Sequence, residues 1–555
     1  MLRWSSRLIA LVTLALTGCY DQGGGVEPPL DRIYFPVGLA LTPGGTRLYV
    51  VNSDFDLQYN GGALQALDLT RVREVVPKAC DEDADCSESG RVCDLLPTDE
   101  NGGQPSRWCV DASGPHAGKP CGPYGEKGPA SKLLFPGRCG HVNHLRPQDG
   151  GPSLVVGKVG IGAFATDVIY RSRPTGPGGR LFIPVRGDAT LHYIDVVDDS
   201  EAPAVPFELD CGQGANGGDC DDAHRRGDDP DQENTRDLRL APEPFGIAAT
   251  PDGEAIVVTH QTEGAASLFV NDAAAWGDGE ASLGDGPKLN FIAGGMPQRV
   301  IGVAALPPPA LAQELKVPYD PGFLVTFRDA AQVNLLRYFS DAASKPARPF
   351  MQVAGSAAIT ANSLGVDSRG IAIDADERKA CEIACPGGAG DARTTCLSEC
   401  AGVPIRVYIA NRAPSSLLVG ETRPNQGLFS NDDLPKLQES IPLSFGPSRV
   451  VVGKVIGLDG APHTRVFVVC FDSRKVGVYN PATHAMEDWI ETGRGPHGFV
   501  TELGADASGA PSYAHAYVAH FTDSYIGVVD LDMRNTTFGT ILTTLGRPSA
   551  PRASK

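Results

Sequence analysis

Residues 36–52 read PVGLALTPGGTRLYVVN, and residues 244–260 repeat the pattern as PFGIAATPDGEAIVVTH. In both stretches two alternating apolar runs flank a Pro-Gly-Gly or Pro-Asp-Gly turn, in which glycine accepts a positive φ. This arrangement predicts an antiparallel hairpin. A third apolar run follows each hairpin, at 63–68 and at 266–271. The repeated unit therefore contains at least three strands.

Five weaker copies of this unit are visible through their second and third apolar runs. They lie at 181–195, 322–337, 407–419, 466–479 and 516–530. Because 555 residues exceed one ordinary hydrophobic core, seven copies predict a repeat architecture. The pattern resembles the YVTN and NHL families of β-propeller repeat, whose units are four-stranded blades around a central channel. The resemblance implies an all-β fold, a seven-bladed β-propeller of four-stranded antiparallel blades over residues 32–555. We expect residues 546–548 to close the ring against residues 32–36.

Three segments interrupt the repeats, at 77–140, 197–240 and 377–403. The first and third are rich in cysteine and the second is an acidic loop. We expect the first and the third to extend the surface of the ring without contacting its core. Apart from Cys19 and Cys470, the cysteines form even groups, and disulfides within each group are the chemistry of an oxidising compartment. The candidates are Cys80, Cys86, Cys93, Cys109, Cys121, Cys139, Cys211, Cys220, Cys381, Cys385, Cys396 and Cys400.

The third insertion, residues 377–403, contains two C-x₃-C pairs, Cys381 with Cys385 and Cys396 with Cys400. Cysteines four residues apart lie on one face of a helix, so the pattern predicts a short α-hairpin held by two disulfides. Four thiolates also suit zinc, which is the alternative. The oxidising compartment favours the disulfides.

The first eighteen residues have the layout of a secretory signal, with Arg3 and Arg7 before a short apolar run at 8–16. This run is too short to span a bilayer as a helix. The four residues that end at Cys19, LTGC, resemble the bacterial lipobox. The resemblance implies that residues 1–18 are removed, that the Cys19 thiol receives diacylglycerol, and that the new amine is acylated, for example with palmitate. The alternative is an ordinary secretory signal with a coincidental cysteine.

Residues 19–31 are polar and rich in glycine and proline, which predicts a flexible tether. An aspartate after the lipidated cysteine favours the inner membrane in enteric bacteria. Tyr20 occupies that position, so we expect a lipid-anchored protein of the bacterial envelope, in the outer membrane. The formal charge of −19 argues against nucleic acid as a partner. The expected partners are the membrane, reached through the lipid, and envelope proteins or a small anionic ligand.

In propellers of these families the residue between the opening proline and glycine of a blade faces one mouth of the channel. Three arginines and a histidine there would form an anion site, whereas the alternative is that they bond carbonyls of neighbouring blades. The aligned positions hold Val37, Phe245, Arg299, Arg369, Arg449 and His497. A second ring follows the second strands, with Asn52, Arg186, His260, Arg328, Asn411, Arg412, Asp472 and His520. The candidate ligand-binding residues are Arg299, Arg369, Arg449, His497, Arg186, His260, Arg328 and His520.

The sequence contains no nucleophile elbow, phosphate loop, zinc-protease helix or haem-attachment motif. We therefore expect a non-catalytic binding or scaffolding propeller without a cofactor. The second hypothesis is a propeller lyase or lactonase, in which the arginines hold an anionic substrate and His497 or His260 is the general acid or base. The third is a metal-dependent redox protein, with zinc or copper bound by His260, His497 and His520.

Replacing Cys19 by alanine removes the thiol on which lipidation depends. We expect cells that express the wild-type chain to incorporate radiolabelled palmitate into it, and the Cys19→Ala variant to incorporate none. The matched control is Cys470→Ala, which removes the other cysteine outside the even groups and should leave labelling intact. Labelling of the Cys19→Ala variant would contradict the lipobox interpretation.

Overall fold

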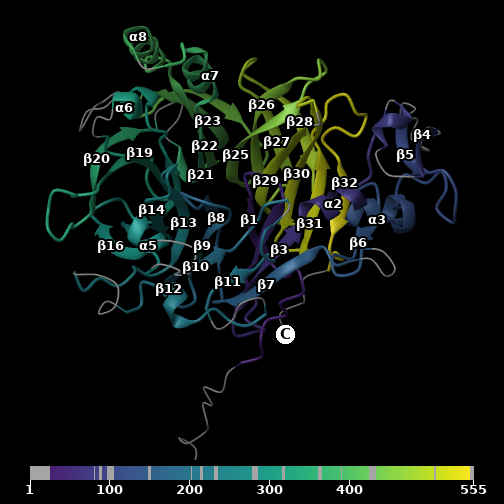
Figure 1. Cartoon of the computed structure of the whole chain (residues 1–555), viewed down its shortest axis with the longest axis horizontal. Coiled ribbons are helices and arrows are strands. Elements are labelled where there is room, and N and C mark those ends of the chain that lie inside the picture. Colours follow the sequence, from purple (N-terminus) through teal and green to yellow (C-terminus); the bar gives the residue numbers. More distant parts are fainter. Residues whose placement is uncertain are drawn as a thin grey trace, which may run out of the picture.

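The computed structural model describes residues 25–80, 82–86, 90–96, 106–147, 152–201, 203–212, 217–229, 236–277, 285–315, 319–359, 365–388, 390–423, 433–505 and 508–549. Seven sheets of at least four strands stand around a central channel (Figure 1), which confirms the predicted seven-bladed β-propeller. The predicted signal peptide, Cys19 and the first residues of the tether lie outside the described residues. No helix in the described ranges is long and apolar enough to cross a membrane.

Each blade is built from strands that follow one another along the chain. Blades 1 to 4 contain β1 (Pro36–Leu41), β2 (Arg47–Asn52), β3 (Gly62–Asp68) and β7 (Val155–Ile161); β8 (Ile169–Ser172), β9 (Gly179–Val185), β10 (Thr190–Val196), β11 (Leu209–Asp210) and β12 (Arg225–Arg226); β13 (Pro244–Ala249), β14 (Ala255–His260), β15 (Ala266–Val270) and β16 (Lys288–Ala293); and β17 (Val300–Ala305), β18 (Gly322–Phe327), β19 (Gln332–Phe339) and β20 (Phe350–Ala358).

Blades 5 to 7 follow the same order. They contain β21 (Val366–Asp374), β22 (Ile405–Ala413), β23 (Ser415–Thr422) and β24 (Lys436–Pro442); β25 (Pro447–Ile456), β26 (Pro462–Cys470), β27 (Lys475–Asn480) and β28 (Ala485–Glu491); and β29 (Pro496–Ala505), β30 (Pro511–His520), β31 (Tyr525–Asp530) and β32 (Ile541–Leu545). The outer strand of blade 2, β11, lies within residues 197–240, so this segment is more than a loop insertion.

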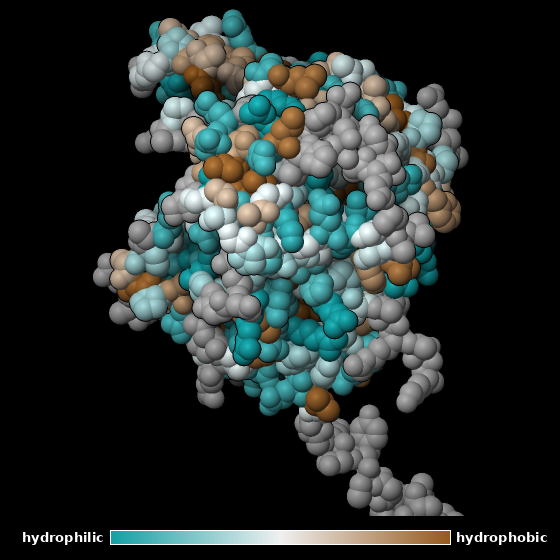
Figure 2. All heavy atoms as spheres, turned by 90° about the vertical axis from the view of Figure 1, so that its right-hand side faces the viewer, coloured by the Kyte–Doolittle hydropathy of each residue, from teal (hydrophilic) through white to brown (hydrophobic). Residues whose placement is uncertain are grey.

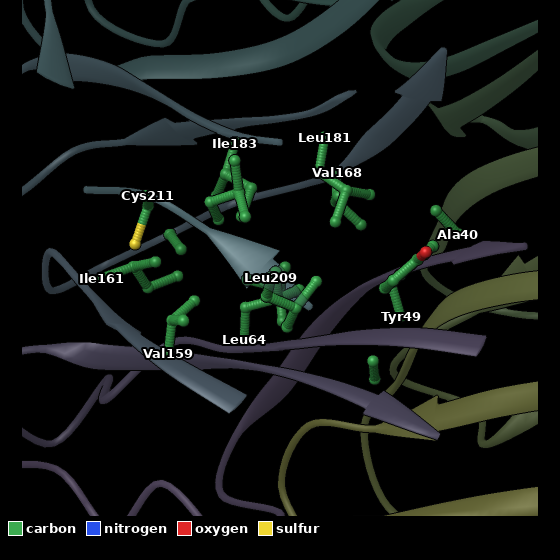
Figure 3. Packing of buried hydrophobic residues seen from close by; sticks show 14 of the residues in the cluster. Ala40, Tyr49, Leu64, Val159, Ile161, Val168, Leu181, Ile183, Leu209 and Cys211 are labelled. Carbon is green, nitrogen blue, oxygen red and sulfur yellow. The ribbon is translucent and has the colours of Figure 1, made fainter. Parts of the chain in front are cut away.

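The hydrophobic core lies between neighbouring blades. Along β2, Tyr49 and Val51 pack against residues of blade 2, whereas Leu48 and Val50 pack against residues of blade 7. This alternation follows from the pleat of a strand, which sends successive side chains to opposite faces. Figure 3 shows the cluster between blades 1 and 2, where Leu64 and Val159 of blade 1 lie near Leu209 of blade 2. Burial on both faces explains why the strands are almost continuously apolar.

The cysteine-rich insertion after β3 does contact the core, so the prediction that it only extends the surface is wrong. Its hairpin, β4 (Arg91–Leu96) with β5 (Ser106–Asp111), carries Trp108, which is 1% exposed and belongs to the cluster between blades 1 and 7. Helices α2 (Leu69–Val75) and α3 (Pro129–Leu134) flank this hairpin. The insertion is held by disulfides between Cys80 and Cys93, Cys86 and Cys109, and Cys121 and Cys139.

The same insertion bridges the seam at which the ring closes. Its strand β6 (His141–Val142) lies parallel to β32, the outer strand of blade 7, before the chain returns to blade 1 as β7. The backbone of Cys139 donates a hydrogen bond to Leu542 at 2.8 Å. Ile33, in the arm that precedes β1, packs in the same cluster as Leu545. Both the insertion and the N-terminal arm therefore hold the last blade to the first.

The helical hairpin lies at the periphery of the ring (Figure 1), as the twin C-x₃-C pattern predicts. Helices α7 (Asp376–Ala384) and α8 (Asp391–Cys400) are joined by disulfides from Cys381 to Cys400 and from Cys385 to Cys396. They pack on α6 (Ala310–Leu315) of blade 4, and α5 (Ala273–Trp276) lies in blade 3. A further disulfide joins Cys211 to Cys220, and Cys470 is a buried free thiol.

Two disulfides of almost equal loop length allow the role of the insertion to be tested. Cys121 and Cys139 are 18 residues apart and Cys381 and Cys400 are 19 residues apart, so the entropy of loop closure gives each about 3 kcal/mol. We expect the Cys121→Ala/Cys139→Ala variant to lower the free energy of unfolding of the whole ring by about this amount, because this disulfide holds the seam.

The matched control is Cys381→Ala/Cys400→Ala, which should unfold the peripheral hairpin and shift the main transition less. Urea denaturation followed by circular dichroism and by the fluorescence of the buried Trp108 measures both variants. Equal shifts of the main transition would contradict a special role for the seam disulfide.

Candidate functional site

A cavity of about 380 Å³ opens at one mouth of the channel. Its volume lies within the range of small-molecule sites, about 300–1,000 Å³. The segments that begin the seven blades all contribute to its wall, and residues that follow the second strands form its rim. The residues of the wall include Val37, Thr166, Asp167, Phe245, Ile301, Arg369, Ser448, Arg449 and His497. The residues of the rim include Ser53, Phe55, Arg186, Arg412, Phe471 and Phe521.

A β-bulge in the first strand of a blade turns side chains of the wall residues toward the channel. In blade 1, Pro36 pairs with Asn52 and Gly38 with Val51, so Val37 is the extra residue of the first strand. The same shift makes Phe245, Arg369 and His497 the extra residues of their blades. Such bulges re-aim side chains in many functional sites. The sequence pattern therefore identified the position that faces the cavity in these four blades.

Arg299 does not line the cavity, because the extra residues of blade 4 are Ile301 and Gly302. The alignment of Arg299 with Arg369 is therefore displaced by two residues. The Arg299 side chain is 48% exposed and its Nε lies 3.4 Å from Asp329. Arg328 also lies outside the lining, and its Nε donates to Asp367 at 3.2 Å.

The position after the extra residue is glycine in five blades, where neighbouring first strands approach closely. A Cβ on Gly38 would lie 2.9 Å from the backbone of Asp167, and one on Gly370 would lie 2.9 Å from the Cα of Arg449. The other three are Gly246, Gly302 and Gly498. In blades 2 and 6 this position holds Asp167 and Arg449 instead, as the pairings of Ala165 with Val185 and of Pro447 with Cys470 show.

These two exceptional residues bind each other. Arg449 Nη2 lies 2.7 Å from Asp167 Oδ2, and their side chains are 22% and 19% exposed. Blades 2 and 6 are not neighbours in the ring, since blades 7 and 1 lie between them. The ion pair therefore crosses the channel, and both of its residues line the cavity.

The other arginines of the cavity are paired to carboxylates that do not line it. Arg369 donates to Asp367 through Nε at 2.5 Å and Nη2 at 3.0 Å. Arg186 pairs with Glu243, and Arg412 with Asp472. Burial raises the pKa of Asp367, but the hydrogen bond and charge of Arg369 outweigh it and hold that pKa below its usual value. Each guanidinium has five N–H donors, so these pairs leave donors for a ligand.

His497 is neutral at physiological pH. Burial and the adjacent charge of Arg449 lower the pKa of its imidazole to about 4. Its Nδ1 lies 2.8 Å from the carbonyl oxygen of Val37. Because a carbonyl only accepts, we assign the proton to Nδ1, which leaves Nε2 as an acceptor.

His260 and His520 lie inside their blades and not in the cavity. His260 is fully buried, with Nδ1 at 3.1 Å from the carbonyl of Pro242 and Nε2 at 2.8 Å from Ser267 Oγ. His520 is stacked on Tyr525 at a centroid distance of 4.0 Å. Among the described residues, the groups of three potential ligands close enough to share a metal ion are disulfide-bonded cysteines. The three histidines therefore do not form a common site.

A cluster of phenylalanines forms the apolar side of the rim, and the sequence analysis missed it. Phe55 is 50% exposed and its ring lies 5.1 Å from that of Phe521 and 5.7 Å from that of Phe164. Phe471 lies 6.3 Å from Phe521. Phe471 and Phe521 each follow directly after the second strand of their blades, and this shared position was a usable signal.

No family model and no curated protein matches the chain. Among solved structures, a putative 6-phosphogluconolactonase from Bacteroides uniformis is 12% identical with a TM-score of 0.40, over 82% of this chain and 85% of that chain. Hydrazine synthase from Kuenenia stuttgartiensis is 11% identical with a TM-score of 0.42, over 92% of this chain and 99% of that chain. At this identity and TM-score the likeness assigns neither a family nor an activity. The propeller fold rests on the observed sheet topology.

Buried histidines make the stability of the ring depend on pH. Burial lowers the pKa of His260, His497 and His515 to about 4 and that of His520 to about 3. Since the unfolded chain protonates histidine near pH 6.5, it binds more protons than the folded chain between pH 6.5 and 4. We therefore expect stability to be complete above pH 6.5 and to fall on acidification.

The urea midpoint at pH 7.5 and at pH 5 measures this effect. Four carboxyl groups act in the opposite direction, because burial raises the pKa of Asp54 and Asp530 to about 6 and also raises that of Asp320 and Asp374. Burial likewise lowers the pKa of His141 and His144, so six histidines outnumber these four carboxyl groups and the midpoint should fall at pH 5. An unchanged or higher midpoint at pH 5 would show that the histidines are not held neutral.

Proposed function

We propose that the protein is a lipid-anchored binding propeller of the bacterial envelope, which holds a small amphipathic anion at the mouth of its channel. The observation that carries the proposal is the charge of the cavity wall. Four arginines line the cavity, Arg186, Arg369, Arg412 and Arg449, against the single carboxylate of Asp167. Guanidinium groups recognise carboxylates, sulfonates and phosphates through paired hydrogen bonds.

The phenylalanine cluster supports a ligand with an apolar body. Phe55, Phe164 and Phe521 lie on one side of the rim, and Phe245 contributes to the wall. Aromatic rings prefer offset or edge-to-face contacts with a planar apolar group. A ligand that combines such a group with one acidic group would satisfy both parts of the lining.

Binding accounts for the site better than acid–base catalysis. A general base works best with a pKa near the operating pH, whereas the pKa of His497 is lowered to about 4 by burial and by Arg449. His260 is buried inside blade 3 and does not line the cavity. The roles that the lyase or lactonase hypothesis requires are therefore not favoured by this geometry.

The proposed anchor would hold the cavity close to a membrane. Phe35, directly before β1, lies 5.0 Å from Phe521 and 6.2 Å from Phe55, so the N-terminal arm enters the ring beside the cavity. Phe35 is 16 residues after Cys19. At about 3.3–3.6 Å per residue, a fully extended chain limits this span to about 55 Å.

The fluorescent anion 8-anilinonaphthalene-1-sulfonate combines an aromatic body with a sulfonate and serves as the probe. We expect it to bind the folded wild-type protein, and Arg449→Ala to weaken its binding about 10-fold, which is the effect of losing one charged hydrogen bond. Asp167→Asn should strengthen binding, because it removes the carboxylate that competes for Arg449. Fluorescence titration measures the affinity.

The matched control is Arg299→Ala, which removes an arginine from blade 4 that does not line the cavity. Its affinity should stay within about 2-fold of the wild type, as expected for a surface charge. Circular dichroism and melting temperature show that each variant is folded. Equal binding by Arg449→Ala and the wild type would overturn the proposal.

A further inference from the structure

A second cavity, of about 660 Å³, lies at the seam where the ring closes. Four segments meet around it: the N-terminal arm, the residues that follow the cysteine-rich insertion, the turn after β30 and the residues after β32. Its lining is Arg32, Ile33, His141, Asn143, His144, Ser524, Gly546, Arg547, Pro548 and Ser549. Figure 2 shows the side of the molecule on which β6 lies, where hydrophilic residues prevail in the lower half and hydrophobic patches lie in the upper half. We call this cavity the seam pocket.

The seam pocket is basic within an acidic protein. Two arginines and two histidines line it, and none of the described lining residues is acidic. Within the part of the chain that the structure describes, neither Arg32 nor Arg547 forms an ion pair, and Arg32 lies over the ring of Tyr34 at 5.6 Å. Burial lowers the pKa of His141, and the charges of Arg547 and Lys127 lower it further, so these cations lie close to it.

His144 supplies an acceptor that has no partner. The residue is 7% exposed, and its Nε2 lies 2.8 Å from the carbonyl oxygen of Asp31, which assigns the proton to Nε2. Its Nδ1 is buried without a hydrogen bond. It lies 3.7 Å from the position of a Cβ on Gly546, another lining residue. A buried acceptor of this kind costs free energy until a donor meets it.

The hydrogen-bond donors that line the seam pocket are more numerous than the two oxygen atoms of a carboxylate. Arg32 and Arg547 each carry five N–H groups, and the hydroxyl of Ser549, the amide of Asn143 and the imidazole of His141 add to them. A phosphate group has three or four oxygens for such donors. A phosphate monoester also keeps one O–H in part of its population near neutral pH, since its second pKa is about 6, and that O–H matches Nδ1 of His144.

We propose that the seam pocket binds a phosphate monoester, carried either by a lipid headgroup or by a small soluble molecule. The bound group contacts the arm, the residues that follow the insertion and the end of blade 7 together, and so it stabilises the closed ring. This site is separate from the channel cavity, because the two share no lining residue.

Isothermal titration calorimetry of the full chain in detergent, with glycerol 3-phosphate as the soluble probe, tests the proposal. We expect saturable binding, a rise of the melting temperature with ligand, and a loss of affinity of about 10-fold or more in Arg32→Ala and in Arg547→Ala. The matched control is Arg146→Ala, an exposed arginine that follows the insertion and does not line the pocket, which should keep the wild-type affinity.

Flotation with vesicles separates the two sources of the phosphate. The vesicles contain phosphatidylcholine with or without phosphatidic acid, and the Cys19→Ala chain is used so that the lipid anchor does not contribute. If the chain binds the vesicles that contain phosphatidic acid in a manner that depends on Arg547, and does not bind glycerol 3-phosphate, the result supports a lipid headgroup. If it binds glycerol 3-phosphate and not these vesicles, the result supports a soluble ester. Binding of neither, equal binding by Arg547→Ala, or equal affinity for succinate overturns the proposal.

Discussion

The close approach of the seven first strands around the channel is the constraint on which the structure depends. Five blades have glycine at the position after the extra residue, because at Gly38 and Gly370, for example, a Cβ would come within 2.9 Å of the neighbouring first strand. Gly38 shows the limit, since a Cβ there would lie 2.9 Å from the backbone of Asp167. Blades 2 and 6 depart from glycine, and their Asp167 and Arg449 pair across the channel at 2.7 Å. Opposite charges at the two exceptional positions thus allow larger side chains there to form an ion pair across the channel within the cavity wall.

Closure of the ring is the second constraint. The four main strands of each blade come from one stretch of the chain, so none of them links blade 7 to blade 1. Other segments must therefore hold blade 7 to blade 1. The structure meets this need with an insertion that leaves blade 1, adds β6 to the edge of blade 7 and buries Trp108 in the shared core. The cysteine-rich insertion, for which the sequence predicted only a surface role, therefore forms part of the seam between blades 7 and 1.

The sequence predicted the fold but only part of the candidate site, and the reason is register. Repeated hairpins and turns identify blades even when their ends are misplaced by one or two residues. The direction of a side chain cannot be predicted with such an error, because a shift of one residue along a strand places the side chain on the opposite face. His520 pairs with Pro496 and points into its blade, whereas Phe521, one residue later, lines the cavity. Arg299 is displaced by two residues from Ile301 and precedes β17, so the error there moved the predicted site residue along the chain and out of the bulge.

Asp167 was beyond the reach of the sequence pattern for a different reason. The segment before β8 reads ATDV and has neither the proline nor the glycine that begin blades 1, 3 and 7 as PVG, PFG and PHG, so nothing aligned Asp167 with Gly38. Its partner is 282 residues away in the chain, and only the closed ring brings the two together.

The overall charge of −19 and the two basic cavities act over different distances. Salt screens charges beyond about 8 Å at physiological ionic strength, so the acidic surface has little influence on an anion already inside a cavity. Inside a cavity the nearest groups determine the electrostatic potential, and in the channel cavity these are four arginines, His497 and the carboxylate of Asp167. The same acidic surface would repel a polyanion too large to enter. The proposed preference for small anions would therefore follow from the concentration of arginines in the cavities.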